Sequence, residues 1–302
     1  MKKLFAMMLA AAMMMSLASC GAKEEPAPAP APAPEQSTTE PAPAPEAAEP
    51  ALETVTEGKL TVATSPDFAP YEFYAIAEDG TPSLAGFDIA LAEYVADYLG
   101  LELEIIPMDF DGVLMEVATG KVDMGLAGLS PDPDRMDAMD FSDIYYEGGQ
   151  SFVTVTANKD MFKTLEDANN ADISVGAQVA SIQMDLANEF SADADIVPLV
   201  KVTDIIAELL TGKLDGAYIE TAVAESYKVN YPELEIVLDV PYDTEGSAAG
   251  IVKGNEALLA GVNEAIAAAI ADGSMDNFVA EAGELASGTT GILVDGEIVI
   301  DG

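Results

Sequence analysis

The stretch "EVATGKVDMGLAGLS", residues 116–130, has the same construction as a later stretch, "ELLTGKLDGAYIETA", residues 208–222. Each has apolar helix-forming residues, then Thr-Gly-Lys, an apolar residue, an aspartate and a β-type run that leads to a polar residue. Glycine just after a helix and a β run just beyond it indicate a helix that returns the chain to a strand. The repetition predicts two similar α/β lobes. Ligands of such sheets bind beyond the carboxyl ends of the strands, where Ser130 and Glu220 are expected.

The segments around these stretches alternate between strand-like and helical patterns. Strand-like runs lie at 59–64, 101–106, 122–128, 151–157, 173–177, 195–200 and 214–220, and helical runs lie at 87–100, 111–120, 202–212 and from Ser181 onward. Alternation at this spacing predicts parallel sheets covered by helices on both faces. About 230 residues are long for one such unit and comfortable for two.

The N-terminus is typical of an exported protein. Residues 1–19 combine two lysines, a short apolar run and small residues, which indicates a signal peptide rather than a membrane span. The ending "LASC" resembles a bacterial lipobox, so we expect Cys20 to be lipidated and to hold the chain at the outer face of the cytoplasmic membrane. Residues 20–57 continue as a Pro-Ala-rich linker, which cannot bury a core and favours extended polyproline II geometry.

Composition excludes several kinds of site and partner. The chain has no histidine, and Cys20 is its one cysteine. Histidine-based catalysis, Cys-His nucleophiles, HExxH zinc sites and disulfide frameworks are therefore excluded. A formal net charge of −42 repels nucleic acid and anionic lipid headgroups, so we expect no nucleic-acid partner.

Arg135 is the one arginine of the sequence, in "GLSPDPDRMDAMDFSD", residues 128–143. It is either a surface counter-charge for its neighbouring aspartates or a planar fork that binds a ligand carboxylate through two parallel hydrogen bonds. Its rarity alone does not decide between the two.

Six motifs in order resemble bacterial extracellular solute-binding proteins of family 3, the amino-acid receptors of ABC importers. They are "KLTVATSPDFAPYEF", "GFDIALAEYVADYLG", "MDFDGVLMEVATGKVDMGLAGLS", "DRMDAMDFSDIYY", "GKLDGAYIE" and "KGNEALLAGVNEAIAAAIADGSMDNF". The resemblance implies the type II periplasmic-binding-protein fold, with two Rossmann-like lobes joined by two crossover strands. It places lobe 1 at 58–147 plus 247–287 and lobe 2 at 148–246, and leaves 288–302 as a C-terminal extension. The tail "VDGEIV" predicts a hairpin with an Asp-Gly turn, without a function.

The resemblance also assigns the binding residues. Arg135 falls on the family's carboxylate-binding arginine, while Ser130 and the backbone at Gly128 are expected to bind the same head group. Ser181 is expected at a helix start that favours an anion, or as a plain N-cap. The family usually has Gly and then Ser or Thr here, often with a second hydroxyl, and this chain has Ala180, Ser181 and Ile182. Glu220 stands where the family commonly pairs an aspartate with the ligand ammonium. The side-chain pocket is expected to use Phe68, Phe110 and Ser65.

The identity of the ligand rests on Ser65. Several family members, including receptors for basic amino acids and for glutamine, have aspartate here. The missing charge argues against an arginine, lysine or histidine ligand, so Ser65 favours a neutral polar or apolar amino acid. Glu72 could compensate for the missing charge, or have a structural role.

The function implied is capture of a free amino acid by hinge closure, without a cofactor or metal. A monomer delivers the ligand to the membrane subunits of an ABC importer and is not an enzyme. Two alternatives stay open: an exported dehydratase of the same fold, and a lipoprotein that presents its ligand to a sensor.

Overall fold

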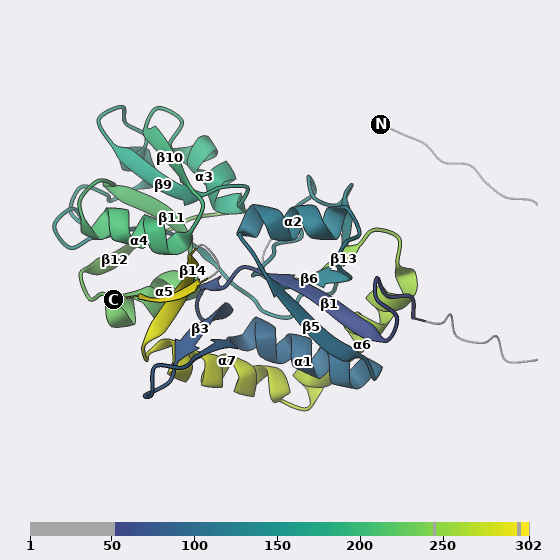
Figure 1. Ribbon diagram of the computed structural model, residues 1–302. Coiled ribbons are helices and arrows are strands. Elements are labelled where there is room, and N and C mark those ends of the chain that lie inside the picture. The colour runs from purple at the N-terminus through teal and green to yellow at the C-terminus, as the bar shows by residue number, and fades with distance from the viewer. Residues whose placement is uncertain (1–51, 244–245, 295–296, 302) are drawn as a thin grey trace, which may run out of the picture. The chain divides into compact units, whose positions relative to one another are not determined.

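The computed structural model describes residues 52–243, 246–294 and 297–301, which belong to the unit Glu49–Gly302 (Figure 1). The predicted signal peptide, Cys20 and most of the linker lie outside the described residues. Within the described part of the chain, no helix is both long and apolar enough to cross a membrane.

The first sheet has the strand order β5-β1-β6-β13-β7. Its strands are β5 (Glu102–Pro107), β1 (Lys59–Thr64), β6 (Met124–Gly125), β13 (Gly250–Val252) and β7 (Met139–Phe141). Strand β1 is parallel to β5 and β6, whereas β13 is antiparallel to β6 and β7. Helices α1 (Phe87–Leu99) and α2 (Phe110–Ala118) cover opposite faces of this sheet, and α6 (Glu256–Ala271) and α7 (Ser274–Ala286) lie beside α1 (Figure 1). We call this sheet and its helices lobe 1.

The second sheet has the strand order β10-β9-β11-β8-β12. Its strands are β10 (Asp195–Leu199), β9 (Ser174–Gln178), β11 (Gly216–Glu220), β8 (Gln150–Val155) and β12 (Leu234–Asp239). Helix α3 (Ile182–Phe190) packs on the face that carries Tyr218, and helices α4 (Val202–Leu210) and α5 (Thr221–Asn230) pack on the face that carries Ala217 and Ile219. We call this sheet and its helices lobe 2. A 3-10 helix, η1 (Leu165–Ala168), lies between β8 and β9 in sequence.

The predicted parallel pairing is confirmed for β1 with β5 and β6 and for β9 with β10 and β11, but the other strands of both sheets pair antiparallel. Strands β8 and β12 run antiparallel to their neighbours in lobe 2, as β13 and β7 do in lobe 1. The reason is connectivity, because β8 and β13 follow segments that cross between the lobes rather than a helix that returns over the same sheet. The two crossing segments run side by side, with an antiparallel bridge between Tyr146 and Ser247.

The repeated stretches build the same helix end twice. Thr119 donates its hydroxyl proton to Met115 O at the end of α2, as Thr211 does to Ala207 O at the end of α4, at 2.7 and 2.8 Å. Each threonine precedes a glycine with positive φ, the conformation that ends a helix at low steric cost.

Asp123 and Asp215, the aspartates of the two repeated stretches, connect neighbouring strands through hydrogen bonds. Asp123 accepts a hydrogen bond from Thr61 N at 2.8 Å, and Asp215 accepts one from Ser174 N at 2.9 Å. Both aspartates therefore have structural roles.

The C-terminal residues form a hairpin on a third sheet. Strand β14 (Thr290–Val294) pairs antiparallel with β15 (Glu297–Asp301) and with β3 (Glu72–Ile76), which also pairs with β2 (Asp67–Phe68) and β4 (Pro82–Ala85). The predicted hairpin is therefore present, although its Asp-Gly turn lies outside the described residues.

Candidate ligand-binding site

Arg135 lies between the two lobes, although it belongs to a loop of lobe 1. Its Nη1 donates to Ser130 O at 3.2 Å, and its Nη2 donates to Ala180 O of lobe 2 at 3.0 Å. The guanidinium also stands over the Phe110 ring, 5.7 Å from its centroid. Burial lowers the pKa of Arg135 from its usual value, although Asp132 and Asp185 oppose the shift. A half-buried guanidinium that spans two lobes differs from the solvated counter-charge that was the alternative reading of the sequence.

The loop from Gly128 to Ser130 is hydrogen-bonded to helix α1 through Asp88. Gly128 has φ +55°, and its N–H donates to Asp88 Oδ2 at 3.0 Å. A side chain at position 128 would place its Cβ 2.7 Å from Phe68 Cε1, so glycine is needed both for the conformation and for the space. Ser130 is buried, and its carbonyl is the one that accepts from Arg135.

The expected pocket residues Phe68, Phe110 and Ser65 are all buried in lobe 1. The ring of Phe68 lies 5.3 Å from that of Tyr71, next to Gly128. Ser65 donates its hydroxyl proton to Asp67 Oδ1 at 3.1 Å. The buried carboxyl group of Asp67 therefore lies beside Ser65, the position whose lack of charge favoured a neutral ligand.

On the lobe 2 side, Ser181 is the N-cap of α3. Its Oγ accepts from Met184 N at 3.2 Å and donates to Gln178 O at 2.7 Å. The hydroxyl proton is thus used within the loop, which agrees with the plain N-cap alternative. The preceding residue, Ala180, has φ +61°, and this unusual conformation for alanine accompanies the contact of its carbonyl with Arg135.

Glu220 ends β11 and is the N-cap of α5. Its Oε2 accepts from Val223 N at 2.9 Å, and its Oε1 accepts from Gly149 N at 3.3 Å. Burial raises the pKa of Glu220 to about 7. The effect of burial is larger than the opposing effect of these hydrogen bonds, which lower the pKa. The Tyr71 hydroxyl of lobe 1 lies near Glu220, and both are next to Gly148. A Cβ at Gly148 would lie 2.8 Å from Glu220 Oε1 and 3.0 Å from Tyr71 Oη.

A buried acidic cluster, which no sequence pattern indicated, lies next to the loop at Gly128. Glu72 and Asp88 are fully buried, as is most of Tyr145. Both oxygens of Glu72, Oδ1 of Asp88 and the Tyr145 hydroxyl make no hydrogen bond of standard geometry within the described structure. Burial, and then the charge of Asp88, raise the pKa of Glu72 well above its usual range. The sequence suggested a role for Glu72 but none for Asp88, because a buried pair of carboxyl groups from separate segments leaves no local sequence pattern.

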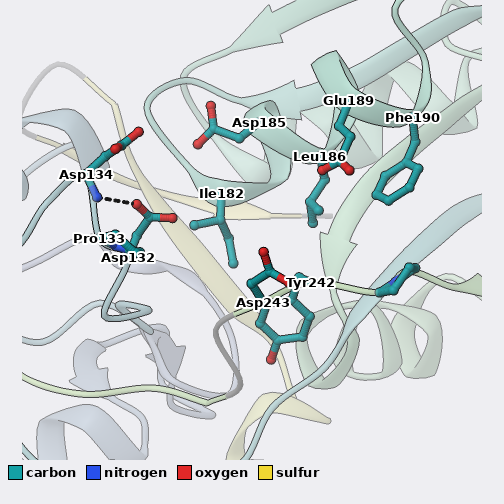
Figure 2. A pocket seen from close by; sticks show the side chains of 11 residues that line it. Asp132, Pro133, Asp134, Ile182, Asp185, Leu186, Glu189, Phe190, Tyr242 and Asp243 are labelled. Carbon is teal, nitrogen blue, oxygen red and sulfur yellow. Dashed lines mark hydrogen bonds between the residues drawn. The ribbon is translucent and has the colours of Figure 1, made fainter. Parts of the chain in front are cut away.

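The aspartates around Arg135 have different surroundings. Asp140 pairs with Lys253 at 2.7 Å. Asp132 and Asp134 line a neighbouring pocket of about 480 Å³, which Figure 2 shows, and Asp134 N donates to Asp132 Oδ1 at 2.7 Å. The pocket is also lined by three acidic residues of lobe 2 and by apolar side chains. None of the predicted binding residues lines it. Its other residues are Pro133, Ile182, Asp185, Leu186, Glu189, Phe190, Pro241, Tyr242 and Asp243. Across the described residues, no group of three or more acidic, histidine or cysteine side chains could hold a metal ion.

A family model, that of the bacterial extracellular solute-binding proteins, family 3, matches residues 60–282. The chain belongs to this family. Its fold is accordingly the two-lobed periplasmic-binding-protein fold, and family members act outside the cytoplasm.

Named relatives include both binding proteins and an enzyme. The arginine-binding extracellular protein ArtP of Bacillus subtilis is 31% identical over 203 residues, which are 66% of this chain and 76% of ArtP. A solved structure of the amino acid ABC transporter substrate-binding protein AbpA of Streptococcus pneumoniae, bound to L-arginine, is 32% identical, with a TM-score of 0.73. The match covers 76% of this chain and 96% of AbpA. Cyclohexadienyl dehydratase of Pseudomonas aeruginosa is 26% identical over 190 residues, 63% of this chain and 69% of the enzyme.

Proposed function

We propose that this family 3 protein is a receptor that captures an L-amino acid between its lobes and delivers it to an ABC importer. The observation that carries the proposal is the position of Arg135, whose guanidinium reaches Ser130 O in lobe 1 and Ala180 O in lobe 2. A planar fork at this position suits a bidentate α-carboxylate, and a ligand held there would touch both lobes. Such a ligand shifts an open–closed equilibrium toward the closed form.

The ammonium of the ligand is assigned to Glu220. This carboxyl group is buried, and because burial raises its pKa to about 7, a cationic partner would favour its ionised form. A ligand ammonium would supply that partner. Gly128, Ser130 and the start of α3 at Ser181 complete the head-group site in this proposal, and Phe68 and Phe110 enclose the side chain.

For the ligand side chain, a cationic amino acid of the arginine type is the stronger candidate. Ser65 favoured a neutral ligand because it carries no charge, but its hydroxyl is bonded to the buried carboxyl of Asp67. Burial raises the pKa of Asp67 to about 6, so this carboxyl also gains from a nearby cation. ArtP is named as an arginine-binding protein, and the AbpA structure is bound to L-arginine. The neutral ligand remains the alternative that the screen below distinguishes.

The proposal includes the localisation and domain organisation that the sequence predicts. Residues 1–19 act as a signal peptide, Cys20 carries the lipid, and the Pro-Ala linker holds a monomeric receptor above the membrane, where importer subunits take the ligand. Lobe 1 comprises 58–147 plus 247–287, and lobe 2 comprises 148–246.

The test is a thermal-shift screen of the 20 amino acids on the chain carrying Cys20→Ser. A ligand that binds the folded state stabilises it by RT ln(1 + [L]/Kd), or about 2.7 kcal/mol at a hundredfold excess over Kd. Arginine is expected to give the largest shift. The proposal fails if no amino acid raises the melting temperature, and the cationic assignment fails if only neutral amino acids do.

A second candidate function is an exported dehydratase, favoured by one observation. Glu220 is a cleft carboxyl with a pKa of about 7, which is suited to proton transfer near neutral pH, and one relative is named as a dehydratase. Incubation with prephenate or arogenate decides between the two. Loss of either substrate supports the enzyme, and binding without turnover supports the receptor.

A further inference from the structure

Asp67 of lobe 1 is hydrogen-bonded to two helices of lobe 2. Its Oδ2 accepts from the backbone N–H of Val202, the first residue of α4, at 2.7 Å. Its backbone carbonyl accepts from the hydroxyl of Tyr227 in α5 at 3.0 Å. One residue of β2 therefore holds two separate elements of the other lobe.

The bond to Val202 meets a need of helix α4. The first N–H groups of a helix have no partner within it, and a side chain at the N-cap usually accepts one of them. The N-cap of α4 is Lys201, which provides no such side-chain bond. The carboxyl of Asp67 takes this role from the opposite lobe, so separation of the lobes at this point would leave the start of α4 without its cap.

The surroundings fix the Asp67 carboxyl in place. Its second oxygen accepts from Ser65 Oγ at 3.1 Å, and the side chain is buried. The charged groups facing it are Lys201 and Asp109, which pair across the lobes at 3.6 Å. Because the Asp109 side chain is 52% exposed, this ion pair is expected to contribute little to closure.

We propose that Asp67 is an interlobe latch, which stabilises the closed arrangement in the absence of ligand and thereby sets the affinity for it. The inference rests on the proposed hinge closure. If the binding-competent form is populated to a fraction f before ligand arrives, the apparent Kd equals the intrinsic Kd divided by f. A latch that raises f strengthens binding through its bond to Val202, apart from any contact between Asp67 and the ligand.

The test measures the distance between the lobes without ligand. Spin labels are placed in the Cys20→Ser chain at Met115→Cys in α2 and Met161→Cys in lobe 2, two exposed positions, and the distance distribution is recorded by pulsed electron resonance. Asp67→Ala removes the acceptor. Val202→Pro removes the donor from the other side, at the first helical position, which tolerates proline. The preceding residue, Lys201, already has φ −117° and ψ 142°, the conformation that a following proline requires.

Both variants are expected to shift the distribution to longer distances. Two controls are expected to keep the wild-type distances: Val202→Ala, which loses side-chain volume but keeps the N–H, and Asp109→Asn. Asp67→Asn keeps an acceptor oxygen and should also remain closed, since burial disfavours the charged form of this side chain. For Val202→Pro, the apparent Kd for L-arginine is expected to rise about tenfold if the closed fraction f falls about tenfold.

The latch is refuted if Asp67→Ala and Val202→Pro both leave the ligand-free distances unchanged. It is also refuted if Val202→Ala opens the lobes as much as Val202→Pro does. Failure of the proposed function gives a different result, because wild-type protein would then bind no amino acid while the distances still report on the latch.

Discussion

Arg135 and Ala180 belong to different lobes, yet the Nη2 of Arg135 donates to the carbonyl of Ala180 at 3.0 Å. The same guanidinium donates to Ser130 O, so its two terminal nitrogens point to opposite walls of the site. An incoming carboxylate would therefore meet a cation whose geometry both lobes define. This relationship leads directly to the first prediction.

Replacement of Arg135 by lysine should weaken amino-acid binding while the fold persists. Lysine keeps the charge but lacks the planar fork, and hydrogen bonds to charged groups are each worth about 1.5–3 kcal/mol. Loss of one corresponds to a Kd about ten to a hundred times higher, measurable by calorimetry with L-arginine. Asp137→Asn, at an exposed position nearby, is the control and should bind normally. Equal affinity in the lysine variant would contradict the assignment of Arg135.

The affinity for the ligand should fall as the pH drops below about 7, because burial raises the pKa of Glu220 to about 7. An ammonium beside it favours the ionised form and so lowers that pKa on binding. A group whose pKa is lower in the complex releases a proton on binding, so affinity weakens by up to about tenfold per pH unit below the free value. Titrations with L-arginine from pH 5.5 to 8 measure the slope. Glu220→Gln should bind weakly and lose the dependence that begins near pH 7, although Asp67, with a pKa of about 6, still titrates at lower pH. A flat wild-type profile would show that Glu220 does not pair with the ammonium.

Replacement of Gly128 by alanine should lower affinity as well as stability. Position 128 has φ +55°, and a Cβ would come within 2.7 Å of Phe68 Cε1, so the loop and the ring must both move. The strain is expected to cost about 1–3 kcal/mol. Gly212→Ala is a matched control, because its φ is +73° but a Cβ there would meet nothing within 4 Å. The control should lose stability and keep its affinity; if both variants bind equally well, Gly128 is not part of the site.

Glu72→Gln should make the protein more stable at alkaline pH. Burial and Asp88 raise the pKa of Glu72 well above its usual range, so its protonated form is the one that suits the fold. For such a group the contribution to stability is fully present below the ordinary pKa and is lost as the pH rises through the raised value. The free energy of unfolding of wild type should therefore fall, as the pH rises above the ordinary carboxyl range, more than that of Glu72→Gln. Thermal unfolding at a series of pH values measures both. Glu104→Gln, on the surface, serves as control. Parallel profiles for wild type and Glu72→Gln would contradict the prediction.

Much of the local structure follows from the sequence by itself. The end of α1 at Gly100, the N-cap at Ser181 and the repeated helix ends at Thr119 and Thr211 lie where their residue types predict them. These features depend on contacts within a few residues, and short-range rules of capping and glycine conformation are sufficient for them. Arg135 also stood out from the sequence, because a single guanidinium in an acidic chain is visible without a structure.

Only the tertiary structure decided which residues meet between the lobes. Asp67 reaches Val202, which is 135 positions away in sequence, and Arg135 reaches Ala180. The antiparallel strands β8 and β13 and the buried pair of Glu72 and Asp88 arise in the same way, from segments that the crossing connections bring together. Local propensity carries no information on how two lobes dock. The sequence therefore determined the parts of the site within each lobe, and the docking of the lobes determined how those parts act on one another.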